Sequence, residues 1–184
     1  MTEISYLMEK GIMAVRKIIT LPDQVLRKKA RKVTDFGPEL QKLVDDMVET
    51  MREAPGVGLA APQVDVALRV IVIEFGEEGE DGEGSPPKLF TIINPEITRY
   101  SQEGEKGTEG CLSIPGFLGE VVRPLAITVK GQNRRGQPIR LKVDGWMARI
   151  FQHEIDHLDG ILFIDRAENV WKHEGEPRQV AIAD

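Results

Sequence analysis

Residues 152–160, Gln-His-Glu-Ile-Asp-His-Leu-Asp-Gly, decide how this chain folds. Positions four apart on an α-helix lie one above the other, so His153 and His157 can direct ring nitrogens at one point in space. Glu154 is rotated by about 100° from His153 around the helix axis, which puts its carboxylate beside that point. There it can accept a proton from a bound water without being a ligand itself. The pattern reads HExxH and predicts a metal site on a helix.

The helix that carries this motif is expected to be buried. Asp144 is its expected N-cap. Burying an unpaired carboxylate costs several kcal/mol, so a buried glutamate between two imidazoles favours a metal site over the alternative of two hydrogen-bonded core histidines beside a paired glutamate. Apolar residues leave the helix no continuous polar face; they are Trp146, Met147, Ile150, Phe151, Ile155 and Leu158.

The composition indicates a globular protein with one substantial core. The chain has 184 residues and a net charge of −6, which argues against a general surface for DNA or for an anionic membrane. No apolar run approaches the roughly 20 residues needed to span a bilayer, and the first residues lack a signal peptide's basic start and apolar centre. The single cysteine, Cys111, excludes an internal disulfide and fits a reducing compartment. We therefore expect a cytoplasmic protein.

The chain is expected to form one catalytic domain over residues 13–184. Met13 offers a second translation start, and the strand-like residues 15–19 follow it directly. We therefore interpret residues 1–12 as an N-terminal extension.

Two helices are expected in the first third of the chain. A short one covers 23–30, and a longer one runs from 38 to about 52, opened by Gly-Pro. On the longer helix, Asp45, Asp46 and Glu49 are expected on the side away from the core. Its apolar stripe, with spacings of three and four, consists of Leu40, Leu43, Val44, Met47, Val48 and Met51.

The rest of the chain is rich in strand signals broken by Gly, Pro and Asn. The acidic, Gly-rich segment 76–87 is expected to be a surface loop. Strands that cluster ahead of one long buried helix indicate an α+β fold. In it, antiparallel β-sheets pack around a buried C-terminal helix carrying HExxH, with one long N-terminal helix. The expected strands are 68–75, 89–94, 97–101, 112–114, 120–123, 126–130, 138–143 and 161–164.

Two histidines do not complete a tetrahedral site, so a third protein ligand is required. The metzincin pattern HExxHxxGxxH holds as far as Gly160 but ends on Phe163, which cannot ligate. A thermolysin-like protease would take a glutamate from a later helix, and the polar tail is too short to build one. Cys111 is the remaining candidate for the third ligand, because the negative charge of a thiolate stabilises a divalent metal. The alternative is that this lone cysteine is simply a small buried apolar residue. The glutamates of the tail are Glu168, Glu174 and Glu176.

A third motif lies upstream, GVGLAAPQ at 56–63. Alone it is weak, because it is not a dinucleotide fingerprint and loops with two glycines are common. Together with EGCLSIPG at 109–116 and QHEIDHLDG at 152–160, however, it closely resembles the three motifs of the peptide deformylase family, in the same order. The resemblance spans about residues 14 to 166.

The resemblance implies a metal-dependent hydrolase that removes the N-formyl group from the N-terminal methionine of newly synthesised proteins and releases formate. It implies Cys111, His153 and His157 as the metal ligands. Glu154 is implied as the general base and later as the acid that protonates the leaving amine. In this family the metal is usually Fe²⁺ in the cell, whereas Zn²⁺ or Ni²⁺ often occupies the isolated protein.

The resemblance also implies an oxyanion hole, made by the side chain of Gln63 and the backbone N–H of Leu112. Loss of one such donor typically lowers the rate by about 10² to 10³. Glu109 and Arg123 are expected to form a buried pair that supports the strand of Cys111, with a surface ion pair as the alternative.

The substrate contacts follow from the same motifs. Gly58, with the backbone of Cys111, is expected to crowd the pocket so that acetyl is rejected and formyl is admitted. Gly110 is a further substrate contact. The candidates for the apolar pocket of the methionine side chain are Val57, Ile150 and Leu112, with Arg149 as a fourth whose orientation the sequence does not fix.

The implied partners are N-formylmethionyl nascent peptides, with a transient ribosome contact and a monomeric enzyme. Two other classes stay open. An HExxH metallopeptidase that cleaves internal peptide bonds would need a long groove and a third carboxylate or histidine ligand. A non-catalytic module with a structural zinc normally has four protein ligands and has no use for Glu154.

Overall fold

The structure is a computed structural model that describes residues 14–54, 56–76 and 86–174. The extension expected at 1–12 and most of the loop expected at 76–87 lie outside these residues. The described elements, in chain order, are η1 (Gln24–Arg27), α2 (Pro38–Glu53), β1 (Gly58–Ala60), η2 (Ala61–Val64), β2 (Val70–Phe75), β3 (Lys88–Tyr100), β4 (Gly104–Gly110), β5 (Phe117–Pro124), β6 (Ala126–Gln132), β7 (Pro138–Asp144), α3 (Gly145–Leu158), α4 (Phe163–Arg166) and β8 (Asn169–Lys172).

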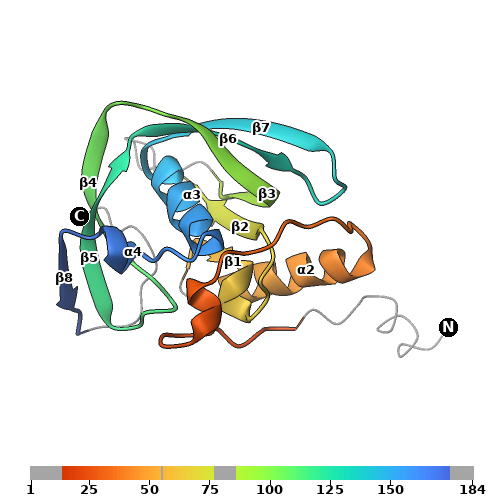
Figure 1. The fold of residues 1–184 in the computed structure, drawn as a ribbon, viewed down its shortest axis with the longest axis horizontal. Coiled ribbons are helices and arrows are strands. Elements are labelled where there is room, and N and C mark those ends of the chain that lie inside the picture. Colours follow the sequence, from red (N-terminus) through yellow and green to blue (C-terminus); the bar gives the residue numbers. More distant parts are fainter. Residues whose placement is uncertain (1–13, 55, 77–85, 175–184) are drawn as a thin grey trace.

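The strands form two antiparallel sheets. One has five strands in the order β1-β2-β3-β6-β7, and the other has three in the order β4-β5-β8. The sheets meet at an angle, and α3 lies inside that angle (Figure 1). There α3 contacts β1, β2, β5, β6 and β7. The predicted α+β fold, with antiparallel sheets around a C-terminal helix, is confirmed.

The long N-terminal helix is also confirmed, from Pro38 to Glu53. Its apolar stripe packs on β1 and β2, where Val44 and Met47 are fully buried. Full burial of one such side chain stabilises the fold by about 1.5–3 kcal/mol, so the stripe fixes α2 to the sheet.

Asp46 corrects the expected polar side of α2, because it is only 2% exposed. Its carboxylate accepts hydrogen bonds from the backbone N–H of Ala14 (3.0 Å), from Arg16 Nε (3.0 Å) and from Lys42 Nζ (3.1 Å). Burial raises the pKa of Asp46, but these donors outweigh it and hold the pKa below its ordinary value. A buried carboxylate therefore ties the first described residues to α2.

The motif helix α3 follows Asp144, the N-cap that the sequence predicts. Every residue from Ala148 to Leu158 is buried, as expected for a helix with no continuous polar face. Within the described ranges, no helix is both long and apolar enough to cross a lipid bilayer.

Several element boundaries differ from the sequence predictions. The strands expected at 89–94 and 97–101 are one strand, β3, whose register to β6 shifts twice. Near the first shift Asn94 adopts a positive φ of 52°, so a local irregularity replaces the predicted turn. The helix expected at 23–30 is only the 3₁₀ turn η1, and no strand forms at 15–19, where Ile19 N–H donates to Gln63 O instead.

Tertiary pairing explains the other differences. Residues 112–114 form a turn, closed by Ile114 N–H on Cys111 O at 2.9 Å. Residues 161–164 run into α4, because Asp165 caps it by accepting from Leu162 N–H at 2.8 Å. The strands β1, β4 and β8 were not expected. β4 contains three glycines and forms because β5 supplies a complete antiparallel partner.

Candidate metal centre and active site

Cys111, His153 and His157 lie together in the interior, and each is at most 3% exposed. Their donor atoms all lie within 4.8 Å of one another, and Cys111 Sγ is 3.3 Å from His157 Nε2. Typical metal–sulfur and metal–nitrogen bonds place tetrahedral S and N ligands about 3.6 Å apart. The three side chains can therefore share one ion. Among the described residues this group offers three donors, one fewer than a closed structural zinc site requires.

The buried imidazoles fit a metal ion in a further respect. In the described part of the chain, His153 Nε2 and His157 Nδ1 have no hydrogen-bond partner. A buried polar atom without a partner costs about 1–3 kcal/mol. An ion between the three side chains would offset that cost at His153 by taking Nε2 as a ligand, and His157 would offer Nε2, the nitrogen that lies 3.3 Å from Cys111 Sγ. The residues present therefore fit a divalent metal.

Glu109 orients the first of the two imidazoles. Its Oε2 lies 3.0 Å from His153 Nδ1, which leaves Nε2 for the site, as is usual for a ligating histidine. Burial lowers the pKa of His153, but its interactions with Cys111 and Glu109 outweigh burial and raise the pKa to about 10. Metal binding at this ring would therefore displace a proton.

His157 is in the form that binds metal. Burial, together with the positive charges of His153 and Arg123, holds its pKa well below the usual value. The ring is therefore neutral at physiological pH, and a neutral imidazole is the ligating species.

Glu154 is fully buried beside the three donors. Burial raises the pKa of this carboxyl to about 7, and the charge of Glu109 acts in the same direction against His153 and Arg123. The strand β1 lies directly on it, because a Cβ at Gly58 would be 2.5 Å from Glu154 Oε1. Only glycine allows this approach of backbone to carboxylate.

The amide of Gln63, fully buried in η2, is fixed at both ends. Its Oε1 accepts from Ala60 N–H at 2.9 Å, and its Nε2 lies 3.2 Å from Ser113 Oγ and 3.6 Å from Cys111 Sγ. The GVGLAAPQ segment therefore contacts the EGCLSIPG segment at the metal centre, through Gln63, Cys111 and Ser113. Leu112 follows Cys111 in the same turn and is 7% exposed.

A buried ionic cluster contacts the metal centre through Glu109 and His153. Glu109 accepts from Arg123 through both carboxylate oxygens, each at 2.9 Å, and from Arg149 Nη1 at 2.9 Å. Burial raises the pKa of Glu109, but Arg123 and the His153 ring outweigh burial and hold the pKa far below its ordinary value. Arg123 also contacts Asp156, which Arg166 contacts at 2.6 and 2.7 Å. The predicted buried Glu109–Arg123 pair is confirmed, and the alternative of a surface pair is wrong.

The expected substrate contacts divide between two parts of the core. Ile150 is fully buried and half-buried Val57 packs against the same cluster, between α3 and the five-stranded sheet. Leu112 belongs to the cluster beneath α2. Gly110 ends β4 and pairs with Leu118 of β5.

The orientation of Arg149, which the sequence left open, is set by a buried ionic cluster. Its guanidinium turns to Glu109, to Val121 O at 2.9 Å and to Glu105 O at 2.6 Å. A Cβ at Gly107 would lie 2.8 Å from the guanidinium carbon, so β4 closes over the side chain. The physical reason is the charge of Glu109, which pairs with the arginine in the interior.

Three residues with clear roles at the site were not singled out by sequence. Ser113 accepts a hydrogen bond from Gln63, Asp156 joins Arg123 to Arg166, and the ring of Phe163 stacks on His153 with centroids 6.4 Å apart. Asp156 lies inside the HExxH motif and Ser113 inside EGCLSIPG, so their positions were the available signal. Phe163 takes the place of a metzincin ligand and packs on a ligand instead.

Comparisons with known proteins agree with this geometry. A family model described as polypeptide deformylase matches residues 15–173. The peptide deformylase of Natranaerobius thermophilus is 48% identical over 162 residues, which cover 88% of this chain and 98% of that protein. The enzyme of Desulforudis audaxviator is 48% identical over 160 residues, covering 87% of this chain and 98% of that protein.

Solved structures of the same family share the fold. A crystal structure of peptide deformylase from Thermotoga maritima has a TM-score of 0.76 at 42% identity, covering 84% of this chain and 99% of that one. A class I type b enzyme from Acinetobacter baumannii, crystallised with Met-Ala-Ser bound, has a TM-score of 0.77 at 35% identity, with coverage of 84% and 99%.

Proposed function

The chain belongs to the polypeptide deformylase family, and from this premise we propose how its own residues carry out the reaction. The family removes the N-formyl group from N-formylmethionyl peptides, and this chain is an enzyme of that kind. The observation that supports the proposed roles best is the meeting of three distant motifs. Cys111 Sγ lies 3.3 Å from Nε2 of His157, which is 46 positions later, and 3.6 Å from Nε2 of Gln63, which is 48 positions earlier.

Cys111, His153 and His157 would hold one divalent metal ion. When bound, such an ion supplies Lewis-acid chemistry, because it polarises a carbonyl and makes a water more acidic. We propose Fe²⁺ as the ion in the cell, following the family, although a Cys-His-His donor set by itself suits Zn²⁺ equally. The buried Nε2 of His153 supports the ligand set, since it otherwise lacks a hydrogen-bond partner among the described residues.

Glu154 would move the protons. A carboxyl whose pKa is about 7 can accept a proton from the attacking water and return it to the leaving amine near neutral pH. Burial keeps bulk water from this carboxyl, and Gly58 lies against it. Glycine at position 58 lets the β1 backbone crowd the carboxylate, which supports the proposal that Gly58 favours formyl over acetyl.

Gln63 and the backbone N–H of Leu112 would stabilise the oxyanion that forms when the formyl carbon is attacked. The amide of Gln63 is held by Ala60 and Ser113, so its N–H groups need little reorganisation during the reaction. Preorganised donors of this kind are the largest single contribution in many hydrolases.

The substrate would bind between β1 and the end of β4. We propose Gly58 and Gly110 as backbone contacts, and Val57, Ile150 and Leu112 as the apolar surroundings of the methionine side chain. The related Acinetobacter enzyme was crystallised with Met-Ala-Ser, and a peptide of that type is the expected product here. Because Ile150 is fully buried, side-chain movement at the pocket must accompany binding.

The remaining expectations are also proposals. We propose that residues 13–184 act as a single catalytic domain, as a monomer in the cytoplasm. The substrates are formylated nascent peptides, so a transient ribosome contact is part of the proposal.

Formate release tests the whole assignment. Formyl-Met-Ala-Ser and acetyl-Met-Ala-Ser are compared under anaerobic conditions with Fe²⁺, Ni²⁺ or Zn²⁺ restored to metal-free protein. We expect formate from the first peptide, no acetate from the second, and the highest turnover with Fe²⁺. Cleavage of an internal bond in a longer peptide would support a metallopeptidase instead, and inactivity with every metal would refute the reaction.

A further inference from the structure

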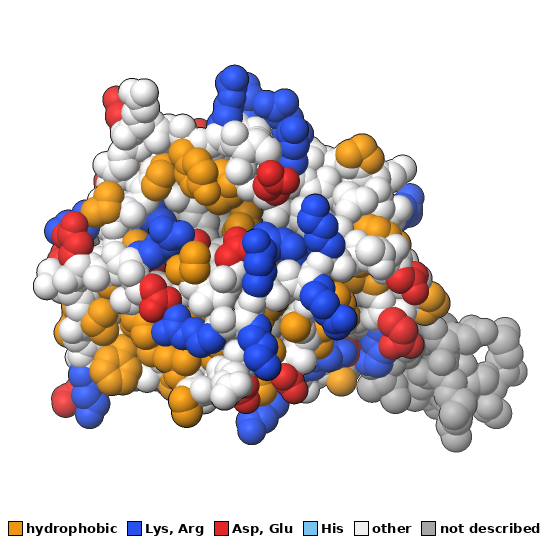
Figure 2. Space-filling model, in the orientation of Figure 1, with side chains coloured by type: hydrophobic (Ala, Val, Ile, Leu, Met, Phe, Trp, Pro, Cys, Tyr) orange, Lys and Arg blue, Asp and Glu red, His pale blue; other side chains and the backbone are white. Residues whose placement is uncertain are grey.

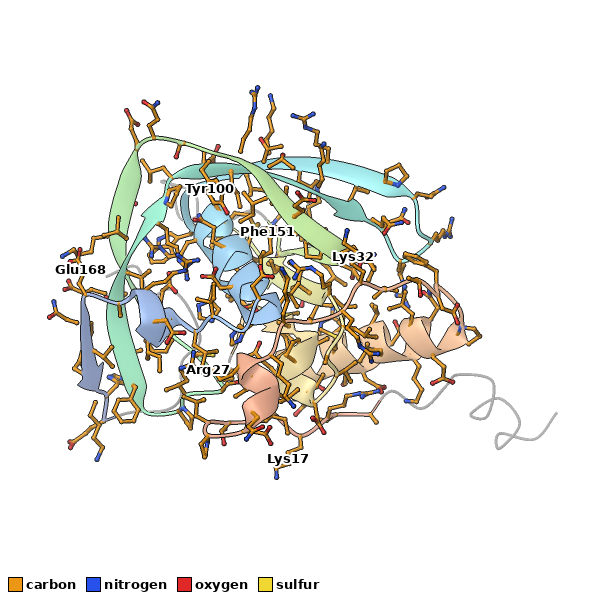
Figure 3. The ribbon with its side chains drawn as sticks, viewed as in Figure 1. Lys17, Arg27, Lys32, Tyr100, Phe151 and Glu168 are labelled. Carbon is orange, nitrogen blue, oxygen red and sulfur yellow. The ribbon has the colours of Figure 1, made fainter. Side chains whose placement is uncertain are left out.

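Residues 27–32, Arg-Lys-Lys-Ala-Arg-Lys, carry five cations in six positions with no acidic residue. All five side chains are exposed, whereas Ala30 between them is buried. We call this stretch the basic segment; Arg27 and Lys32 mark its two ends in Figure 3. Lys and Arg side chains gather over the middle of the face shown in Figure 2, where the segment runs. The whole chain has a net charge of −6, so the basic segment is a positively charged region on an acidic protein.

The basic segment is held rigidly against the core. Leu26, Ala30 and Val33 are its buried anchors. Ala30 N–H donates to Leu158 O at 2.8 Å, and Arg31 bridges to Leu68. Leu158 follows the metal ligand His157 on α3, so the segment is fixed to the end of the catalytic helix. A ligand of this segment would find its cations already ordered, which lowers the entropy cost of binding.

A hollow lies on each side of the basic segment, and Lys32 lines both. The first, of about 430 Å³, is lined by the cations Arg16, Arg31 and Lys32 and by the acidic groups Asp35 and Glu39. The rest of its lining is Thr34 and the apolar residues Val33, Leu40, Leu43, Val66 and Leu68. The second hollow, of about 420 Å³, is lined by Lys29, Lys32 and Arg69, and its acidic groups are Glu96 and Asp159.

Most of the positive charge in the segment is not neutralised. Arg27 pairs with Asp165, and Lys29 reaches Asp159 only at 3.9 Å. Lys28, Arg31 and Lys32 form no ion pair with any residue that the structure describes. Exposed cations without ion-pair partners suit a ligand with repeated negative charges.

We propose that the basic segment binds the phosphate backbone of structured RNA on the ribosome. The choice of RNA rests on the proposed function, because the substrate is a nascent chain and the particle that carries it exposes RNA. The net charge of the whole chain does not oppose this, because the five cations lie together and, among the described residues, only Arg27 and Lys29 of the five have acidic partners. Bound in this way, RNA would hold α3 at a fixed place on the particle.

An anionic membrane fits the segment less well. Stable binding to lipid headgroups usually adds apolar side chains that insert into the bilayer. Among the described residues, no exposed large hydrophobic side chain belongs to the segment or lines either hollow. A phosphate backbone needs only the cations.

The test measures binding of the metal-loaded full chain to purified ribosomes by co-sedimentation, and to a labelled RNA hairpin by anisotropy, at several salt concentrations. The variant Lys29→Gln/Arg31→Gln/Lys32→Gln removes three cations of the segment. Lys88→Gln/Lys106→Gln/Lys172→Gln removes three exposed cations of β3, β4 and β8 and is the matched control. Formate release from free formyl-Met-Ala-Ser is measured for each protein.

We expect the segment variant to bind RNA and ribosomes at least about tenfold more weakly than the unchanged chain, with the slope of log K against log salt reduced by up to about 3. The control should bind within about twofold. Both variants should release formate from the free peptide at the unchanged rate. Lys32→Gln alone, expected to reduce the slope by about 1, keeps the test available if the triple variant does not fold.

Three results would overturn the proposal: equal binding by the segment variant, an equal loss in the control, or no binding of RNA by the unchanged chain. Binding to vesicles of phosphatidylglycerol but not to RNA would also overturn it, in favour of lipid headgroups. If the unchanged chain released no formate, the proposed deformylation would be wrong. The salt titration would still decide whether the basic segment binds RNA.

Discussion

The backbone of Gly58 lies against the carboxylate of Glu154, so closely that a Cβ at position 58 would be 2.5 Å from Oε1. Real Cβ atoms do not approach so near, so any other residue must displace either β1 or the carboxylate. The contact joins the first motif of the chain to the third. It also makes Gly58 the most direct test of whether the position of Glu154 matters for turnover.

Gly58→Ala should lower kcat by about 10²-fold, because a shift of about 1 Å in a reacting group can cost that much. Metal content should be unchanged, since no ligand is touched. Steady-state kinetics with metal analysis checks both. Gly37→Ala is the control, because its Cβ would meet only the side chain of Asp35. Full activity in Gly58→Ala would show that the carboxylate can move without loss.

Glu154→Ala and Cys111→Ser should separate proton transfer from metal binding. The first should keep the metal and lose about 10²- to 10⁴-fold in turnover, the usual contribution of a general acid–base group. The second should lose the metal, because a neutral hydroxyl replaces an anionic thiolate. Metal content per chain, measured beside formate release, decides. If Glu154→Ala also lost its metal, Glu154 would be structural or a ligand.

Gln63→Leu should raise the barrier by about 2.7–4 kcal/mol through kcat, with little change in KM. The amide meets full negative charge only in the transition state, so the neutral substrate gains much less from it. Kinetics on metal-loaded protein tests this. A higher KM at constant kcat would instead make Gln63 a binding residue for the peptide.

Glu109→Gln should destabilise the fold by about 3–5 kcal/mol, because Arg123 and Arg149 would lose their buried partner. Urea unfolding of metal-free protein measures the loss. Glu74→Gln removes the partner of Arg52 in a partly exposed pair at 2.7 Å, and should cost only about 0–1 kcal/mol. If both variants lost the same free energy of unfolding, the buried cluster around Glu109 would have to be accessible to water.

Asp46→Asn should destabilise the protein at pH 7 by about 1.5–3 kcal/mol, as expected for hydrogen bonds to a charged group. The pKa of Asp46 in the folded state lies below its ordinary 3.8. Its contribution is therefore complete above that ordinary pKa and is lost as the pH falls through the folded value. The difference in free energy of unfolding between the two proteins, measured from pH 7 to pH 3.5, should shrink at the acid end. A constant difference would contradict this assignment.

The sequence alone determined the features that depend on local spacing. The positions of His153, Glu154 and His157 on one buried helix follow from a repeat of 3.6 residues per turn. The apolar stripe of α2 follows from the same periodicity, and the resemblance of three motifs supplied the family. These features need no knowledge of distant contacts.

Tertiary structure alone decided the features that depend on which segments meet. Gln63 contacts Cys111, which is 48 positions later in the chain. Glu109 pairs with Arg123 of β5 and with Arg149 and His153 of α3. The charge of Glu109 also set the orientation of Arg149, which the sequence did not determine. A side chain's partners in the interior are set by the packing of the sheets around α3, and spacing along the chain carries no information about that packing.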